Sequence, residues 1–266
     1  MPTDPDALAR RLELAVAAAR EAGEITLRYF GREGLQVDTK ADTTPVTVAD
    51  RQAEEHVRRR ILAAFPDDGI LGEEFGSQEG QSGYRWIVDP IDGTKSFVHR
   101  VPLYGTLVAV ERDGDSRLGV IYIPPTRETV YAAAGQGAWY VCGDEPPRPA
   151  RVSAVDRLRE SLVLTTDVVS FEAPGLRDVY DRLERSARLT RTWGDCFGYL
   201  MVATGRAEVM LDPVAALWDL AALKPVIEEA GGCFLDFEGV PTIHSRQAIA
   251  TTPALRDEVL RLVRNR

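Results

Sequence analysis

Residues 85–97, RWIVDPIDGTKSF, place two aspartates three positions apart at the end of an apolar run. The run at 86–88 is long enough for a short buried strand, and Asp89 and Asp92 follow where that strand would emerge. Pro90 stiffens the backbone between them. Two carboxylates this close raise each other's pKa unless a cation lies between them, and oxygen ligands favour Mg²⁺ or Mn²⁺ over zinc.

The residues that follow this pair are suited to binding phosphate. If a helix begins at residues 93–95, Gly-Thr-Lys, its free backbone N–H groups face the same point as the aspartates. Thr94 could hold a water, and Glu73 or Glu74, after a short strand at 70–71, could accept its proton. Acids at strand ends are also common in solvated turns, so these residues alone leave both interpretations open.

The rest of the chain predicts two successive patterns of secondary structure. The first half has amphipathic helices at 5–30 and 49–65 around a polar loop at 40–50, then strands at 70–71, 86–88, 103–110, 118–123, 129–133 and 138–141. The second half alternates strand and helix: strand 161–165, helix 176–187, extended segment 189–193, helix 196–204, strand 208–211, helix 218–230, a strand pair and helix 254–264.

These patterns predict an α/β protein with helices layered on sheets. The polar, proline-bearing stretch around 143–152 is the expected boundary between two lobes of a single unit spanning 1–266. We expect an N-terminal α+β lobe at 1–147 with the metal site, and a C-terminal α/β lobe at 148–266 with the elements that select the substrate.

Charge and composition exclude several classes of partner. With 32 basic and 41 acidic side chains the chain carries a formal charge of −9, which disfavours nucleic acid and anionic membranes. No apolar run is long enough to span a membrane and no secretion signal begins the chain, so we expect a cytoplasmic protein. A small phosphorylated substrate would also be repelled unless cations occupy its site.

The string WIVDPIDGTKSF resembles the signature of the magnesium-dependent inositol monophosphatase family, which is related to fructose-1,6-bisphosphatase. KADTTPVTVAD, ILGEEFG, GVIYIPP and WDLAALKPVIEEAGG match in the same order, so the similarity spans nearly the whole chain. The resemblance implies a five-layer αβαβα sandwich, usually a homodimer. It also implies a phosphoric monoester hydrolase with two or three Mg²⁺ ions per site, replaceable by Mn²⁺, that lithium inhibits.

The resemblance also implies roles for particular residues. The metal ligands would be Glu73, Asp89, Asp92, Asp219 and the backbone carbonyl of Ile91. A metal-bound water oriented by Thr94 and Glu73 would attack phosphorus in line, and a second metal would steady the leaving alkoxide. Asp219 could instead cap the helix that it opens, and the two roles can coexist.

Further roles follow from the same comparison. Asp50 would support a weaker metal and joins Glu73 and Thr94 as the catalytic residues. Gly93 and Thr94, with Asp92 beside them, would bind the phosphate group of the substrate. Lys40 lies in a loop that closes near the metals.

The substrate is indicated by the second half of the chain. RTWGDCFGYLMVATGRAEVMLDP and VPLYGTLVAVERDG are similar to the branch of the family that hydrolyses L-histidinol phosphate. That substrate carries an ammonium and an imidazole, which Asp195 and Asp212 could bind through charge-assisted hydrogen bonds. Asp195 could equally cap the helix at 196–204. Tyr104 and Trp193 could stack on the imidazole or lie in the core.

Other functions remain open at this point. The alternatives are an inositol-1-phosphate or broad sugar-phosphate phosphatase and, from the lysine in DGTK, an adenosine 3',5'-bisphosphate phosphatase. A non-catalytic regulator that binds a phosphometabolite is also possible, although the complete set of acids favours an enzyme.

Overall fold

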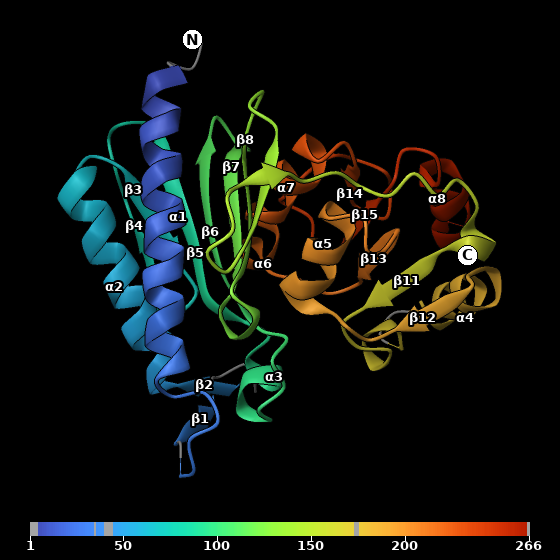
Figure 1. Cartoon of the computed structure of the whole chain (residues 1–266), viewed down its shortest axis with the longest axis horizontal. Helices are drawn as coiled ribbons and strands as arrows, with labels where there is room; N and C mark the ends of the chain where they lie inside the picture. The colour runs from blue at the N-terminus through green and yellow to red at the C-terminus, as the bar shows by residue number, and fades with distance from the viewer. Residues whose placement is uncertain (1–4, 35, 40–44, 173–175, 265–266) are drawn as a thin grey trace.

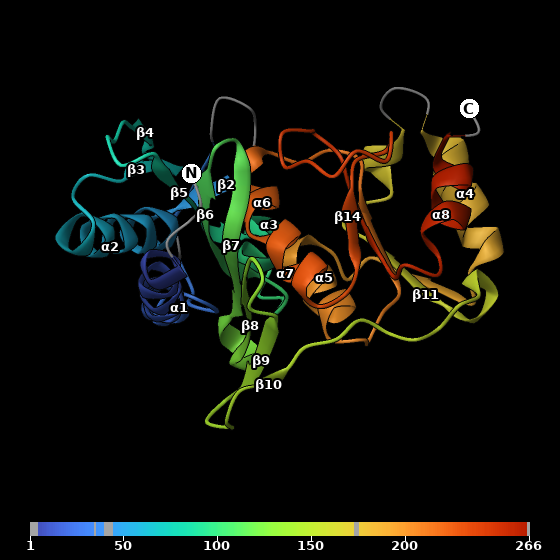
Figure 2. The same ribbon diagram turned by 90° about the horizontal axis from the view of Figure 1, so that it is seen from above.

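The computed structural model describes residues 5–34, 36–39, 45–172 and 176–264 of the 266-residue chain. Within them helices and sheets alternate in five layers, which Figure 1 shows from the side and Figure 2 from above. The αβαβα sandwich expected from the sequence is confirmed.

The outer layer on one side consists of two long helices, α1 (Pro5–Leu27) and α2 (Val48–Ala64). Alanines at 15, 18, 19 and 22 are fully buried, and their small side chains let α1 approach α2 and the sheet closely. Thr47 and Asp50 cap α2 reciprocally. The Thr47 side chain accepts a hydrogen bond from the Asp50 backbone, and the Asp50 side chain accepts one from the Thr47 backbone.

The first sheet has eight strands in the order β10-β9-β8-β7-β6-β5-β3-β4. Their bounds are β3 (Gly69–Gly72), β4 (Gly76–Gln78), β5 (Tyr84–Asp92), β6 (Gly105–Arg112), β7 (Asp115–Ile123), β8 (Glu128–Ala133), β9 (Ala138–Cys142) and β10 (Arg148–Pro149). Strand β5 is buried on both faces: Trp86 and Val88 pack toward α1 and α2, and Ile87 packs toward the middle layer. It continues through both aspartates instead of ending before them.

The middle layer consists of α5 (Asp195–Ala203), α6 (Leu217–Ala221) and α7 (Leu223–Glu229). The helix expected at 218–230 is found at nearly those bounds, but it is divided into two at Ala222, whose φ of −74° and ψ of −28° remain helical. Pro225 lacks an N–H and its ring excludes the carbonyl four residues earlier, so the helix cannot run straight through. The carbonyl of Ala221 accepts a hydrogen bond from the Ser116 hydroxyl instead, at 2.6 Å.

The second sheet has five strands in the order β12-β11-β13-β15-β14, covered by two outer helices. The strands are β11 (Leu162–Thr165), β12 (Leu189–Arg191), β13 (Val209–Asp212), β14 (Cys233–Leu235) and β15 (Ala248–Thr251), and the helices are α4 (Arg177–Ser186) and α8 (Arg256–Arg264). Because β11 and β13 are parallel, their carboxyl ends lie at one edge of the sheet. Thr166 and Asp212 therefore lie near each other.

Short elements complete the fold. They are the paired strands β1 (Val37–Thr39) and β2 (Pro45–Thr47), the helix α3 (Thr94–Val98), and 3-10 turns at Pro124–Thr126, Leu158–Glu160 and Val169–Phe171. Of these, β1, β2 and α3 lie below the first sheet in Figure 1. The sequence predicted a loop through residues 40–50. In the structure 45–47 form a strand and 48–50 begin α2, while residues 40–44 lie outside the described part of the chain.

Candidate active site

Asp89 and Asp92 lie on the same side of β5 because the strand contains a bulge. In a regular strand, residues three apart point to opposite faces. Here Asp89 pairs with Leu107 and Asp92 with Gly105, so three steps along β5 match two steps along β6. The extra residue turns both carboxylates toward the middle helices.

Pro90 fits this bulge for a simple reason. It has no N–H to lose from the ladder of hydrogen bonds between the strands. Its carbonyl accepts a hydrogen bond from the buried hydroxyl of Thr106 at 2.9 Å. The Ile91 N–H next to it donates to the Asp89 carboxylate at 3.0 Å, which fixes that side chain.

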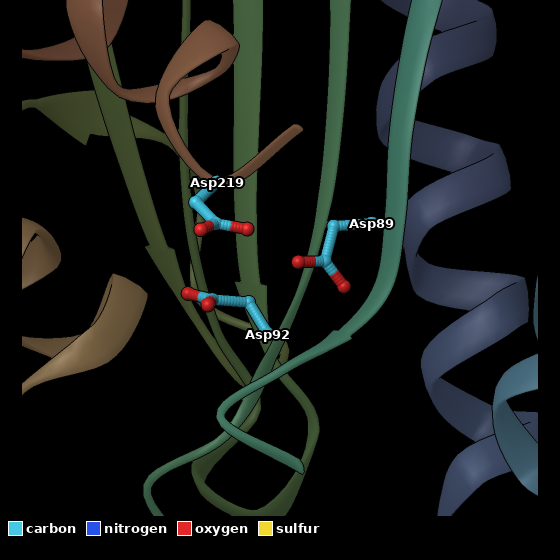
Figure 3. Close-up of side chains that lie close together, drawn as sticks. All are labelled: Asp89, Asp92 and Asp219. Atoms are coloured by element: carbon cyan, nitrogen blue, oxygen red, sulfur yellow. The ribbon is translucent and has the colours of Figure 1, made fainter. Parts of the chain in front are cut away.

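Asp219 joins the pair from α6, more than a hundred residues later in the chain. Figure 3 shows the side chains of Asp89, Asp92 and Asp219 directed toward a common centre. One carboxylate oxygen from each lies within 4.8 Å of the others. Asp219 also accepts a hydrogen bond from the Ala216 N–H at 2.7 Å, so it caps α6 and faces the cluster at once.

The three carboxylates repel one another in a buried place. Burial raises the pKa of Asp89 well above its usual value, and the charges of Glu73 and Asp92 raise that pKa further. Burial likewise raises the pKa of Asp92 well above its usual value, with Asp195 and Asp219 adding to it. Burial raises the pKa of Asp219 to about 7, although the Ala216 hydrogen bond opposes the shift.

This cluster fits a hard divalent cation. It offers carboxylate oxygens only, which suit Mg²⁺ or Mn²⁺, and a bound cation removes the repulsion that raises these pKa values. Among the described residues that line the surrounding cleft, only Lys95 has a cationic side chain. A lysine outside the carboxylate cluster does not replace a cation at its centre.

Glu73 lines the cleft over the cluster, and Asp50 is close enough to Glu73 to interact with its charge. Glu73 follows β3, where its N–H donates to the Val88 carbonyl at 3.2 Å, and its charge acts on both Asp89 and Asp50. One oxygen of Asp50 accepts from the Thr47 N–H and hydroxyl at 2.8 and 2.6 Å. The other oxygen is buried without a hydrogen bond to any residue the structure describes. Burial raises the pKa of Asp50 to about 6.

The turn after β5 brings backbone groups to the same place. Gly93 has a φ of 86°, a conformation that side chains disfavour, and α3 starts directly after it. The N–H groups of a first helical turn have no partner within the helix. The Thr94 hydroxyl donates to the Ile91 carbonyl at 3.0 Å, the carbonyl expected among the metal ligands.

A cleft of about 300 Å³ opens over the cluster. It is lined by most of the expected site residues: Glu73, Asp89, Ile91, Asp92, Gly93, Thr94, Asp195 and Asp219. A smaller cavity of about 50 Å³ shares Asp92, Asp195 and Asp219 with it and adds Asp212. The structure therefore brings together residues from five separate segments, while Lys40 lies outside the described residues.

Asp195 does not act as the cap of α5. The cap position belongs to Gly194, which makes no side-chain capping bond, and the Cys196 N–H donates to Asp92 at 2.5 Å. Asp195 has a φ of 49° and its N–H donates to the Thr166 hydroxyl at 2.7 Å. A Cβ atom on Gly93 would lie 3.0 Å from the Asp195 carboxylate, so that side chain lies over the turn after β5.

Asp195 in the cleft and Asp212 in the adjoining smaller cavity form an acidic end of the site. Burial raises the pKa of Asp195 to about 7, and the charge of Asp212 is the next cause. Burial raises the pKa of Asp212 to about 6, opposed by polar contacts with Thr166 and Tyr199. Thr166, which the sequence analysis did not single out, thus contacts both acids from the end of β11.

The two aromatic candidates lie in different environments. Tyr104 is fully buried, packs edge-on against Phe97 with ring centroids 4.9 Å apart, and has its hydroxyl 3.1 Å from that of Thr26. It belongs to the core and cannot stack on a substrate. Trp193 is 39% exposed and lines an apolar hollow with Leu103 and Phe197, next to the cleft.

Comparison with known proteins agrees with this geometry. Residues 7–266 match the family model described as the inositol monophosphatase family. The chain is 48% identical over 232 residues to a histidinol-phosphatase from Chlorobaculum parvum, covering 87% of this chain and 88% of that protein. It is 41% identical over 249 residues to a histidinol-phosphatase from Mycobacterium tuberculosis, covering 94% and 96%.

A similar fold has been solved before. The crystal structure of extragenic suppressor protein suhB from Bartonella henselae superposes with a TM-score of 0.87 at 31% identity, covering 96% of this chain and 99% of that one. Among the described residues, no helix is both long and apolar enough to cross a membrane.

Proposed function

The chain belongs to the inositol monophosphatase family, and we propose that it hydrolyses L-histidinol phosphate to L-histidinol and phosphate. As a member of that family it is a metal-dependent phosphomonoesterase. The observation that carries the choice of substrate is the acidic end of the site, where Asp195 in the cleft and Asp212 in the adjoining cavity lie beside the metal-binding carboxylates. The histidinol-phosphatases at 48% and 41% identity support the same choice.

In this proposal Asp89, Asp92, Asp219, Glu73 and the Ile91 carbonyl hold Mg²⁺ or Mn²⁺, and Asp50 supports a further ion. The bound ions would polarise the ester and stabilise the charge that develops on the leaving oxygen. The buried oxygen of Asp50 without a hydrogen bond to any described residue supports its part in this set. A buried carboxylate oxygen that has no hydrogen bond is stabilised when a cation accompanies it.

The chain's own groups then orient the reaction. The backbone N–H groups of Gly93 and Thr94 bind phosphate oxygens, which the left-handed turn at Gly93 supports. Glu73 and Thr94 orient a water, and Glu73 accepts its proton. The water oxygen bonds to phosphorus, and the bond from phosphorus to the ester oxygen breaks. The leaving oxygen takes a proton from solvent to give the alcohol, and Glu73 returns the proton that it accepted to solvent. No phosphoenzyme is needed.

The alcohol end of the substrate carries the specificity. Asp195 and Asp212 accept hydrogen bonds from the ammonium and imidazole of histidinol phosphate, and each such bond to a charged group contributes about 1.5–3 kcal/mol. Inositol has hydroxyl groups only and gains less from two carboxylates. The raised pKa values of both acids support the assignment, because a cationic partner would offset the burial and repulsion that cause them.

Comparison of three esters tests this assignment. We expect kcat/KM for L-histidinol phosphate to exceed that for inositol 1-phosphate and adenosine 3',5'-bisphosphate, measured as phosphate release at the same Mg²⁺ concentration. Asp212→Asn should lower kcat/KM for histidinol phosphate about 10- to 100-fold, and for inositol 1-phosphate much less. Asp178→Asn, an exposed acid on α4, is the matched control. Equal turnover of inositol 1-phosphate by the wild-type protein would reject the assignment.

A further inference from the structure

Glu54 is a fully buried carboxylate in the middle of α2. Its neighbours Ala53 and Val57 belong to the core between α2 and the first sheet. A buried carboxylate is strongly destabilising unless hydrogen bonds or an opposite charge compensate it. Its role is not visible in the sequence alone, although it stands four residues after Asp50.

The partners of Glu54 lie on the turn that follows β3. One oxygen accepts a hydrogen bond from the Glu74 N–H at 2.6 Å, and the other accepts from the Phe75 N–H at 3.2 Å. The second oxygen also accepts from the Arg58 Nε at 2.7 Å. Both backbone N–H groups directly after Glu73 are thus held by one side chain.

Arg58 extends the same contact by one helical turn. Its guanidinium donates to the Gly76 carbonyl and lies 5.9 Å from the centre of the Phe75 ring. Residues four apart share one face of a helix, so Asp50, Glu54 and Arg58 form a row along α2. This row meets the turn in order: the charge of Glu73 acts on Asp50, Glu54 binds the N–H groups of residues 74 and 75, and Arg58 binds the carbonyl of residue 76.

Gly72 shows how close this contact is. A Cβ atom on Gly72 would lie 1.9 Å from the Glu54 carboxylate, nearer than any side chain permits. The glycine before Glu73 therefore leaves the space that the Glu54 carboxylate occupies. The turn at residues 72–75, GEEF, and the Glu54 side chain from α2 therefore pack together as one structural unit.

We propose that Glu54, supported by Arg58, is a positioning residue that orients Glu73 toward the metal site. This inference rests on the proposed metal role of Glu73. By fixing the peptide between residues 73 and 74, the Glu54 carboxylate limits the directions in which the Glu73 side chain leaves the turn. Residues that orient a metal ligand in this way typically change metal affinity or activity 10- to 100-fold when replaced.

Glu54→Gln tests this role without changing the length of the side chain. Glutamine offers one acceptor oxygen and sets an amide donor against a backbone N–H, so the turn loses one of its two hydrogen bonds. We expect the Mn²⁺ dissociation constant, measured without substrate from the electron paramagnetic resonance of free Mn²⁺, to rise about 10- to 100-fold. The kcat should fall by a similar factor. Glu55→Gln, the exposed neighbour on α2, should bind Mn²⁺ as the wild-type protein does.

Two outcomes would overturn the proposal. The first is a Glu54→Gln protein with a lowered melting temperature but wild-type Mn²⁺ affinity and kcat, which indicates a purely structural role. If that variant does not fold, Arg58→Met provides the test: it keeps an apolar chain near Phe75 and removes the bonds to Glu54 and Gly76. We expect about 3- to 10-fold weaker Mn²⁺ binding, and unchanged binding would be the second overturning outcome. A wild-type protein that binds no Mn²⁺ would instead reject the proposed function.

Discussion

Replacing Asp92 by asparagine is expected to abolish phosphate release while the chain remains folded. Asparagine keeps an oxygen that can accept the Cys196 N–H, so α5 retains its contact with β5. It removes one negative charge from three carboxylates whose oxygens lie within 4.8 Å. We expect kcat to fall at least about 1,000-fold, which corresponds to about 4 kcal/mol of activation free energy.

The same substitution should not lower the stability of the metal-free protein, although it lowers kcat. Burial and like charges raise the pKa of Asp92 in the folded chain, so its ionised form destabilises the metal-free protein at neutral pH. The melting temperature of metal-free Asp92→Asn should therefore equal or exceed that of the wild-type protein, while the rise on adding Mg²⁺ is lost. Asp113→Asn, an exposed acid in the turn between β6 and β7, serves as the control. A kcat within tenfold of wild type would remove Asp92 from the mechanism.

The largest effect on stability is expected from Asp68→Ala. The Asp68 carboxylate is buried and accepts two hydrogen bonds from Arg11, both at 2.8 Å. It also accepts from the Trp86 indole at 2.8 Å and the Ser82 hydroxyl at 2.6 Å. Alanine would leave a buried guanidinium without its counter-charge, which typically lowers the free energy of unfolding by about 3–5 kcal/mol.

Urea denaturation of the two single variants Asp68→Ala and Asp67→Ala measures this effect directly. Asp67 is the adjacent residue, but its side chain is exposed and its backbone carbonyl makes the contacts to residues 81 and 82. We expect Asp67→Ala to change the free energy of unfolding by less than about 0.5 kcal/mol. A loss of under 1 kcal/mol in Asp68→Ala would show that the network around Arg11 contributes little.

Much of the fold was predictable because burial imposes a regular pattern on helices and strands. The alanine-rich face of α1 and the apolar strands of the first sheet follow their expected periods. The break at Ala222 was missed because the apolar pattern continues across it, although Pro225 was a visible signal. Strand β5 was predicted to end before Asp89, since charged residues seldom continue a buried strand. In this strand two carboxylates do so.

The site itself could be predicted only in part. The pair Asp89 and Asp92 is visible in the sequence, but regular alternation would have placed them on opposite faces. The bulge that brings them together depends on the pairing with β6. Asp219 reaches the cluster through the packing of α6 against the first sheet, a long-range contact that no local pattern reveals. Family resemblance supplied that residue, and it did not supply Glu54.

The capping roles show why local and functional interpretations were hard to separate. Asp219 both caps α6 and faces the cluster, so the two expectations for it were compatible. Of the two roles left open for Asp195, the cap is not found, because the cap position belongs to Gly194 and Asp92 from another layer accepts the N–H of Cys196. A capping bond from a residue 104 positions away cannot be predicted from the residues next to a helix.

Anomalous diffraction from crystals grown with Mn²⁺ tests the central claim most directly. We expect Mn²⁺ peaks between the carboxylates of Asp89, Asp92 and Asp219, with Glu73 beside them. The proposed metal site would be contradicted by a crystal at saturating Mn²⁺ in which these three side chains turn away from one another and the ion binds elsewhere or nowhere.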